Sequence, residues 1–173
     1  MWEAESGYHN HADPWKEERY MTPTIDKRTA AELIRSRDFS GRDLRSIDAC
    51  DRVLSGLVAT EAQLRDARFD RAKLCNARFT KANLSNAHFV DADLNGASFR
   101  DADVEGADFT GADLRGVDFT GTSVIGASFM TESNGKRHEA IIDETTCLPE
   151  NVIAPLFPEQ LAFVKSKLTN NAS

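Results

Sequence analysis

Large apolar residues recur at every fifth position over much of the chain, and a small residue stands two positions before each of them. From residue 64 to residue 129 this register runs without insertion or deletion. A helix would place apolar residues every three or four positions and a strand every second position, so neither element explains a period of five. The large residues are Leu64, Phe69, Leu74, Phe79, Leu84, Phe89, Leu94, Phe99, Val104, Phe109, Leu114, Phe119, Val124 and Phe129.

A period of five indicates a coil with four short sides. If each unit forms one extended side and a corner, four units close a coil of about twenty residues, and successive coils stack about 4.8 Å apart as parallel strands do. This stacking places phenylalanines above one another in two ladders, which begin at Phe69 and Phe79. The small residues are needed because a narrow shaft cannot hold two large side chains on each side. The pattern therefore predicts an all-β solenoid.

The first coils exchange the two inward positions. Ile47 and Leu57 stand at the small position, whereas Ala49 and Ala59 stand at the large one. This exchange keeps the volume of each pair roughly constant, and cores tolerate such changes best. We therefore expect the coil to continue through both exchanged pairs.

Corners are expected at the second position after each large residue. Glycine, asparagine and aspartate are common there, and these residue types tolerate a left-handed backbone. Arg71 and Lys81 depart from this preference. We expect a different turn type on the sides that carry them.

Segments without the register flank and interrupt the predicted solenoid. The stretch TAAELIRSR predicts a short helix with Thr29 and Glu32 as a capping box and with Ala31, Leu33 and Ile34 buried. The predicted segments are a flexible tail (1–21), an N-terminal cap helix region (22–36), the solenoid (37–131), a polar insert (132–139) and a C-terminal cap (140–173) with a helix at about 158–168.

Composition narrows the class of protein. The chain has 173 residues, suited to one domain, and its net charge of −7 argues against direct binding of nucleic acid or an anionic membrane. No signal-like or membrane-spanning stretch is present in this sequence. Cys50, Cys75 and Cys147 are widely spaced and indicate neither a disulfide framework nor a zinc site. We expect a cytoplasmic protein.

The sequence predicts no catalytic residue, no cofactor and no metal site. His88 and His138 stand near no recognisable nucleophile signature, and a filled shaft has no room for a substrate. His9, His11 and Asp13 have a ligand-like spacing in the tail. Metal coordination needs three or four organised ligands, so this spacing is interpreted as incidental.

The repeated A(D/N)LXX unit resembles that of the pentapeptide-repeat proteins, from about Arg37 to Phe129. The resemblance implies a right-handed quadrilateral β-helix with solvent-exposed faces, closed here by short capping helices at both ends. The family includes gyrase-binding resistance proteins, regulatory proteins, secreted effectors and members of no known role. The resemblance therefore predicts the fold, and function has to be argued from sites.

Charge is divided along the predicted rod. Residues 37–81 hold ten basic and seven acidic side chains, whereas residues 82–131 hold eight acidic and two basic ones. One interpretation is that the carboxylates mimic nucleic-acid phosphates in the DNA-binding saddle of a type II topoisomerase. The other is that aspartate suits exposed corners and keeps the protein soluble. The acidic residues are Asp91, Asp93, Asp101, Asp103, Glu105, Asp108, Asp113 and Asp118.

The function predicted first is a non-catalytic rod or adaptor that binds a protein partner along its faces. The alternatives are a DNA-mimicking binder of a topoisomerase, which would protect or inhibit gyrase, and a secreted effector scaffold.

The C-terminal helix is expected to cover apolar residues of the last coil within one chain, which favours a monomer; a C-terminal homodimer is the alternative. The residues of this cap or dimer contact are Ile125, Met130, Leu161, Val164 and Leu168.

Overall fold

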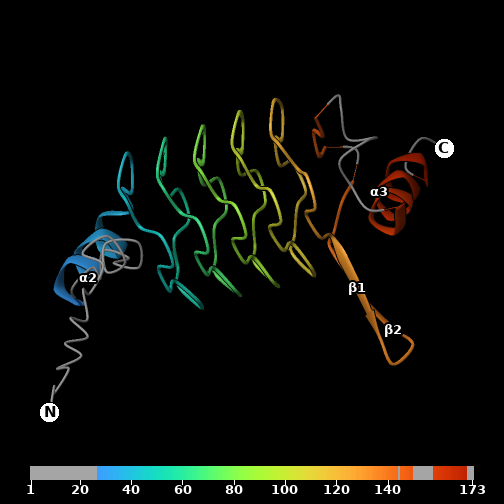
Figure 1. Ribbon diagram of the computed structural model, residues 1–173, viewed down its shortest axis with the longest axis horizontal. Helices are drawn as coiled ribbons and strands as arrows, with labels where there is room; N and C mark the ends of the chain where they lie inside the picture. Colours follow the sequence, from blue (N-terminus) through green and yellow to red (C-terminus); the bar gives the residue numbers. More distant parts are fainter. Residues whose placement is uncertain (1–26, 144, 150–157, 171–173) are drawn as a thin grey trace, which may run out of the picture.

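The computed structural model describes residues 27–143, 145–149 and 158–170 (Figure 1). Stacked coils form a rod with one helix at each end, and a two-stranded hairpin projects from its side near the C-terminal end. The predicted tail, residues 1–21, lies outside the described residues. The helices and strands are α2 (Lys27–Ser36), β1 (Met130–Ser133), β2 (Lys136–Glu139) and α3 (Pro158–Asn170).

Each coil contains twenty residues. Parallel bridges join positions twenty apart, from Asp38 and Val58 at one end to Asp108 and Ser128 near the other. Backbone bonds run in both directions between neighbouring coils, as when the amide of Phe39 donates to the carbonyl of Val58 at 2.7 Å. The chain thus forms a right-handed quadrilateral β-helix.

The shaft of this helix is filled by the large residues of the repeat. All fourteen are at most 1% exposed. Phe69 stacks on Phe89 with ring centroids 5.2 Å apart, and Phe79 stacks on Phe99 at 4.9 Å. The two ladders meet edge to face, with 5.6 Å between the rings of Phe89 and Phe99. Such pairs add about 0.5 to 1.5 kcal/mol each beyond the burial of their area.

The exchanged pairs fit the same shaft. Ile47 is 9% exposed, while Leu57, Ala49 and Ala59 are fully buried. The coil therefore accepts a large residue at either inward position if its companion is small.

Every regular corner has a left-handed backbone, whatever residue occupies it. Arg71 and Lys81 have φ angles of 57° and 58°, close to the 56° of Asn76. The expectation of a different turn type at these two residues is therefore wrong. A left-handed conformation costs an ordinary residue about 1 to 2 kcal/mol. Hydrogen bonds on both sides of the corner offset this cost: the amide of Arg71 donates to Val90 at 2.8 Å, and that of Ala72 to Phe69 at 3.0 Å.

Aspartate, asparagine and serine often precede the large residue for a structural reason. The side chain at this outward position accepts a bond from the amide two residues further on, as Asp108 does from Thr110 and Asp118 does from Thr120, both at 2.9 Å. Neither amide donates to a backbone carbonyl in the coil. Since buried and half-buried amides need a partner, many acidic residues of the rod are explained by the backbone.

At the N-terminal end, α2 differs from the prediction. The helix begins at Lys27, so Thr29 lies inside it and is no N-cap. Leu33 is buried and Ile34 is half-buried against the core, but Ala31 is exposed. Two residues rotate a side chain by about 200° around a helix, which places Ala31 away from Leu33.

The last coil is interrupted by a β-hairpin and then resumes. Asp113 bridges to Ile141 instead of residue 133, and the inward residues Ala140 and Ile142 are 2% and 4% exposed. The interruption, interpreted from the sequence as a polar insert over 132–139, pairs β1 with β2 in antiparallel register. Asn134 and Gly135 have φ angles of 53° and 71°, as the tightest hairpin turns require.

Candidate protein-binding surfaces

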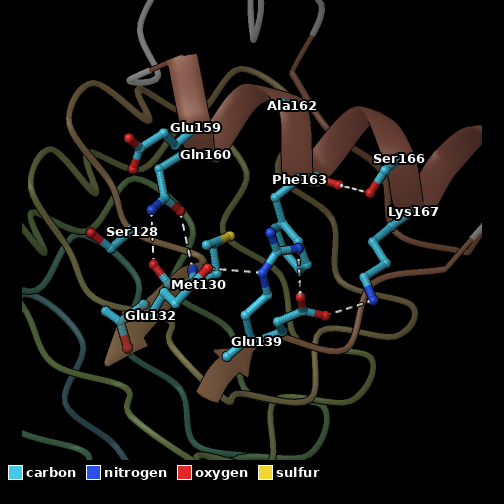
Figure 2. Close-up of a pocket in the computed structure, with 12 residues that line it drawn as sticks. Ser128, Met130, Glu132, Glu139, Glu159, Gln160, Ala162, Phe163, Ser166 and Lys167 are labelled. Atoms are coloured by element: carbon cyan, nitrogen blue, oxygen red, sulfur yellow. Dashed lines mark hydrogen bonds and ion pairs between the residues drawn. The ribbon is translucent and has the colours of Figure 1, made fainter. Parts of the chain in front are cut away.

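A cleft of about 1050 Å³ lies between the hairpin and α3 (Figure 2). The hairpin supplies one wall, the helix supplies the other, and the last coil closes the base. Most of the cleft is thus built by the part of the chain that leaves the five-residue register. Its lining residues are Ser128, Met130, Thr131, Glu132, Arg137, Glu139, Glu159, Gln160, Ala162, Phe163, Ser166 and Lys167.

Gln160, on the first turn of α3, fixes the helix to the last coil. Its Oε1 accepts bonds from the amides of Phe129 at 2.7 Å and Met130 at 3.1 Å, and its Nε2 donates to the carbonyl of Met130 at 2.8 Å. Gln160 is only 9% exposed. One side chain therefore satisfies backbone groups that a further coil would otherwise bond, and it closes the open end of the rod.

The predicted cap residues behave differently from one another. Val164 is fully buried, and Leu161 and Met130 are half-buried against the core. Ile125 is 50% exposed, so the expectation that the helix covers both outward residues of the last coil holds for Met130 alone. The reason is that Gln160 anchors α3 at Met130, on a different side of the coil. The side chain of Leu168 lies outside the described part of the chain.

Charged side chains in the cleft pair with one another. The Nε of Arg137 lies 3.0 Å from Glu132, and Lys167 lies 2.8 Å from Glu139 across the cleft (Figure 2). Lys167 also lies over the ring of Phe163, 5.2 Å from its centroid. The exposed charged side chains of the cleft resemble the polar rim of a protein–protein contact.

The hairpin is attached to the side of the rod through His138. The Nε2 of His138 lies 2.6 Å from Oδ1 of Asp91, which belongs to the predicted acidic surface. Gly111 leaves the space for this contact, because a β-carbon at this glycine would overlap both side chains. Asp91 therefore holds the hairpin as well as contributing charge.

The remaining predicted acids are distributed over all four sides of the rod. Asp93 and Asp113 are neighbours on one side, joined by a parallel bridge. Asp113 pairs with Arg115, and this hydrogen-bonded pair holds the pKa of the carboxyl below its ordinary value. Asp118 pairs with Arg100 at 3.1 Å.

Asp101, Asp103, Glu105 and Asp108 have no ion pair among the residues that the structure describes. Because the acidic residues are distributed over all four sides, they form no continuous strip along one side.

The described residues show no sign of a metal site. Nowhere in residues 27–143, 145–149 and 158–170 do three histidine, cysteine, aspartate or glutamate side chains gather as metal ligands would. Among the helices of these same ranges, none has the length and apolar character that crossing a membrane requires.

Comparison with known proteins identifies the family. Residues 62–132 match the family described as pentapeptide repeat region. A pentapeptide repeat protein from the Arabidopsis thaliana thylakoid lumen is 33% identical, covering 55% of this chain and 70% of that protein with a TM-score of 0.46. The chain belongs to the pentapeptide-repeat family.

Two other pentapeptide-repeat structures are more distant. HetL, involved in heterocyst differentiation regulation in Nostoc sp. strain PCC 7120, is 23% identical over 60% of this chain and 46% of its own, with a TM-score of 0.39. QnrB1, a plasmid-mediated fluoroquinolone resistance protein, is 16% identical over 75% of this chain and 69% of its own, with a TM-score of 0.36. A comparison with curated proteins gave no match. None of these likenesses assigns a partner to this pentapeptide-repeat protein.

Apart from Met130, the residues that line the cleft were not predicted as site residues from the sequence. The Asn134–Gly135 dipeptide is the usual signal of a tight hairpin and would have indicated β1 and β2. No comparable signal connects Gln160 with Phe129, because its partners are backbone groups.

Proposed function

We propose that this pentapeptide-repeat protein is a non-catalytic rod that binds a protein partner on its outer surface. Pentapeptide-repeat proteins are generally non-catalytic structural or binding proteins. The observation that carries the proposal is the filled shaft, in which Phe89, Phe99 and Phe109 are fully buried and in contact. Because the interior has no room for a substrate, function has to reside on the sides and ends of the rod.

The cleft between the hairpin and α3 is the proposed site for a segment of that partner. It is concave, whereas the repeated sides are regular, and it combines the exposed charges of Arg137 and Glu132 with the half-buried side chain of Met130. Concave surfaces that offer an apolar anchor and a polar rim are favoured in protein recognition.

Affinity capture from the source cells tests this proposal. The wild type, Arg137→Glu and Lys73→Glu would each serve as bait; both variants change charge equally at exposed residues, but only Arg137 lines the cleft. The expected result is a protein that the wild type and Lys73→Glu retain and Arg137→Glu loses. Equal retention by all three baits would remove the cleft from the proposal, and no retained protein at all would contradict the binding role.

The alternative, mimicry of DNA toward a type II topoisomerase, is supported by the eight acidic against two basic residues of the C-terminal coils. It is weakened by their placement, because Asp113 and Asp118 pair with arginines and the acids occupy all four sides. We therefore rank this function second.

A DNA gyrase supercoiling assay, with and without a fluoroquinolone and at low and moderate salt, separates the two functions. The rod is expected to have no effect even in large excess. Inhibition or drug protection at stoichiometric protein would instead favour mimicry, if it weakens with salt and is lost in the triple variant Asp93→Asn, Asp103→Asn, Asp113→Asn. An effect that survives the triple variant would indicate another surface.

A further inference from the structure

One side of the rod carries a column of outward residues whose charge changes from basic near the N-terminal end to acidic near the C-terminal end. We call it the Leu84 side, after the large residue of its middle coil. Two columns of outward residues follow the rod axis there, and parallel bridges hold the first column in register. The first column is Asp43, Gln63, Asn83, Asp103 and Ser123, and the second is Arg45, Arg65, Ser85, Glu105 and Ile125.

Two charges of the second column are poorly paired within the chain, whereas Arg45 is already held by Asp43 at 2.8 Å. Arg65 is 58% exposed and has only a loose contact with Asp66, at 3.7 Å. Glu105 is exposed and has no ion-pair partner among the described residues. Beyond it, Ile125 is one of the exposed large hydrophobic residues.

The middle of the Leu84 side is small and flat. The hydroxyl of Ser85 donates to Asn83 at 2.7 Å and also lies 3.0 Å from a carboxylate oxygen of Asp103. These short side chains lie close to the backbone, so nothing long projects from the centre of this side. Another flat surface can therefore approach it closely.

We propose that the Leu84 side pairs with the same side of a second copy, with the two rods antiparallel. The two copies are related by a two-fold axis that lies in the plane of contact, perpendicular to the rods, and passes through Ser85. Each column then faces the same column of the second copy, in reverse order. Arg65 then faces Glu105 of the second copy, and the same pair occurs again on the other side of the axis. Ile125 faces the alkyl part of the second copy's Arg45, since arginine stems cover apolar surface.

Charge selects this arrangement over a parallel one. In a parallel pair each residue of the first column would face the second column at the same level. Asp43 would then face Arg45 of the second copy, but these two residues already pair within each chain at 2.8 Å, so little is gained. Asp103 would face Glu105 of the second copy. Like charges brought together in this way disfavour a contact, whereas the antiparallel pair joins opposite charges twice. Charge therefore favours a second copy as the partner and an antiparallel orientation of the two rods.

The expected association is weak and sensitive to salt. The five levels of the columns are separated by four spacings of about 4.8 Å and span only about 20 Å, so the area buried lies below that of stable specific contacts. Exposed charge pairs contribute modestly and are screened within about 8 to 10 Å at moderate ionic strength. This inference concerns self-association and does not depend on the proposed partner site.

Sedimentation velocity over a range of protein and salt concentrations tests the pairing. Arg65→Glu and Glu105→Arg are each expected to weaken self-association about tenfold or more, because each creates two like-charge contacts. An equimolar mixture of the two variants should associate again, since both contacts between them have opposite charges. The double variant Arg65→Glu/Glu105→Arg should also recover. Lys73→Glu, with the same charge change on another side, should behave as the wild type.

A cysteine at the two-fold axis gives a second measurement. In a chain whose Cys50, Cys75 and Cys147 are replaced by serine, Ser85→Cys should form a disulfide-linked dimer on mild oxidation. Asn95→Cys, at the matching position on the opposite side of the rod, should not. The proposal is overturned if the wild type stays monomeric at high concentration and low salt, if the mixed variants fail to associate, or if both cysteines cross-link equally.

Discussion

The regular coils and the C-terminal closure are stabilised in different ways. In the coils each contact is repeated every twenty residues, so Phe79, Phe99 and Phe119 occupy equivalent positions, with ring centroids 4.9 and 5.1 Å apart. In the closure each contact occurs once, and Gln160 alone bonds three backbone groups of the last coil. Stability is therefore shared among equivalent residues in the coils and concentrated on a few side chains in the closure.

This difference bears on how the two regions respond to damage. Loss of one ring from a ladder removes its contacts with the neighbouring rings and lowers the stability of the whole cooperative stack. Loss of an anchor such as Gln160 from the closure should free α3 locally, while the hydrogen bonds between the coils remain.

The largest effect is expected in the middle of a ladder. Phe99→Ala should lower the free energy of unfolding by about 3 to 5 kcal/mol, because a fully buried ring is replaced by a cavity. Arg100→Ala, which removes an exposed ion pair with Asp118, should cost less than about 1 kcal/mol. Urea unfolding followed by circular dichroism measures both. Similar costs at the two positions would mean that the inward register is wrong.

A smaller and local effect is expected at the anchor of the closure. Gln160→Ala leaves the amide of Phe129 without its partner and should cost about 1 to 3 kcal/mol. Amide hydrogen exchange should then speed up in α3 and β1, while protection in the coils around Phe89 is unchanged. Glu159→Ala, an exposed neighbour on the same turn, is the control. Faster exchange throughout the rod would show that the closure is part of one cooperative unit.

The smallest effect is expected from pH. The side-chain hydrogen bond from Arg115 lowers the pKa of Asp113 in the folded chain. A carboxyl with a lowered folded pKa stabilises the fold above its unfolded pKa of about 3.9, and this contribution is lost as pH falls through the folded value. Asp113→Asn should therefore lose less stability than the wild type between about pH 5 and about pH 2, by less than about 1 kcal/mol. If the free energy of unfolding falls equally in the two proteins as pH is lowered, Asp113 does not contribute to the loss of stability in acid.

The part of the fold that repeats was predictable from the sequence, and the part that does not repeat was predicted incompletely. The five-residue register predicted the coil, because local geometry and a filled shaft allow few alternatives. The turn at Arg71 was predicted wrongly, since inter-coil hydrogen bonds override the preference of a single residue. Gln160 and His138 were missed as structural anchors because their partners Phe129 and Asp91 lie thirty-one and forty-seven residues away in the chain.

The exchanged pairs restrict the order in which this rod can change its sequence. An alanine–large pair and a large–alanine pair, such as Ile47 with Ala49, fill the same space, but no single substitution converts one into the other. If the large residue is replaced first, the cavity costs about 2 to 5 kcal/mol of stability. If the alanine is replaced first, the overpacked shaft costs about 1 to 3 kcal/mol. The less costly path therefore passes through an overfilled coil. Each exchanged pair thus divides neighbouring sequences into two groups separated by an unstable intermediate, even though both groups fold to the same rod.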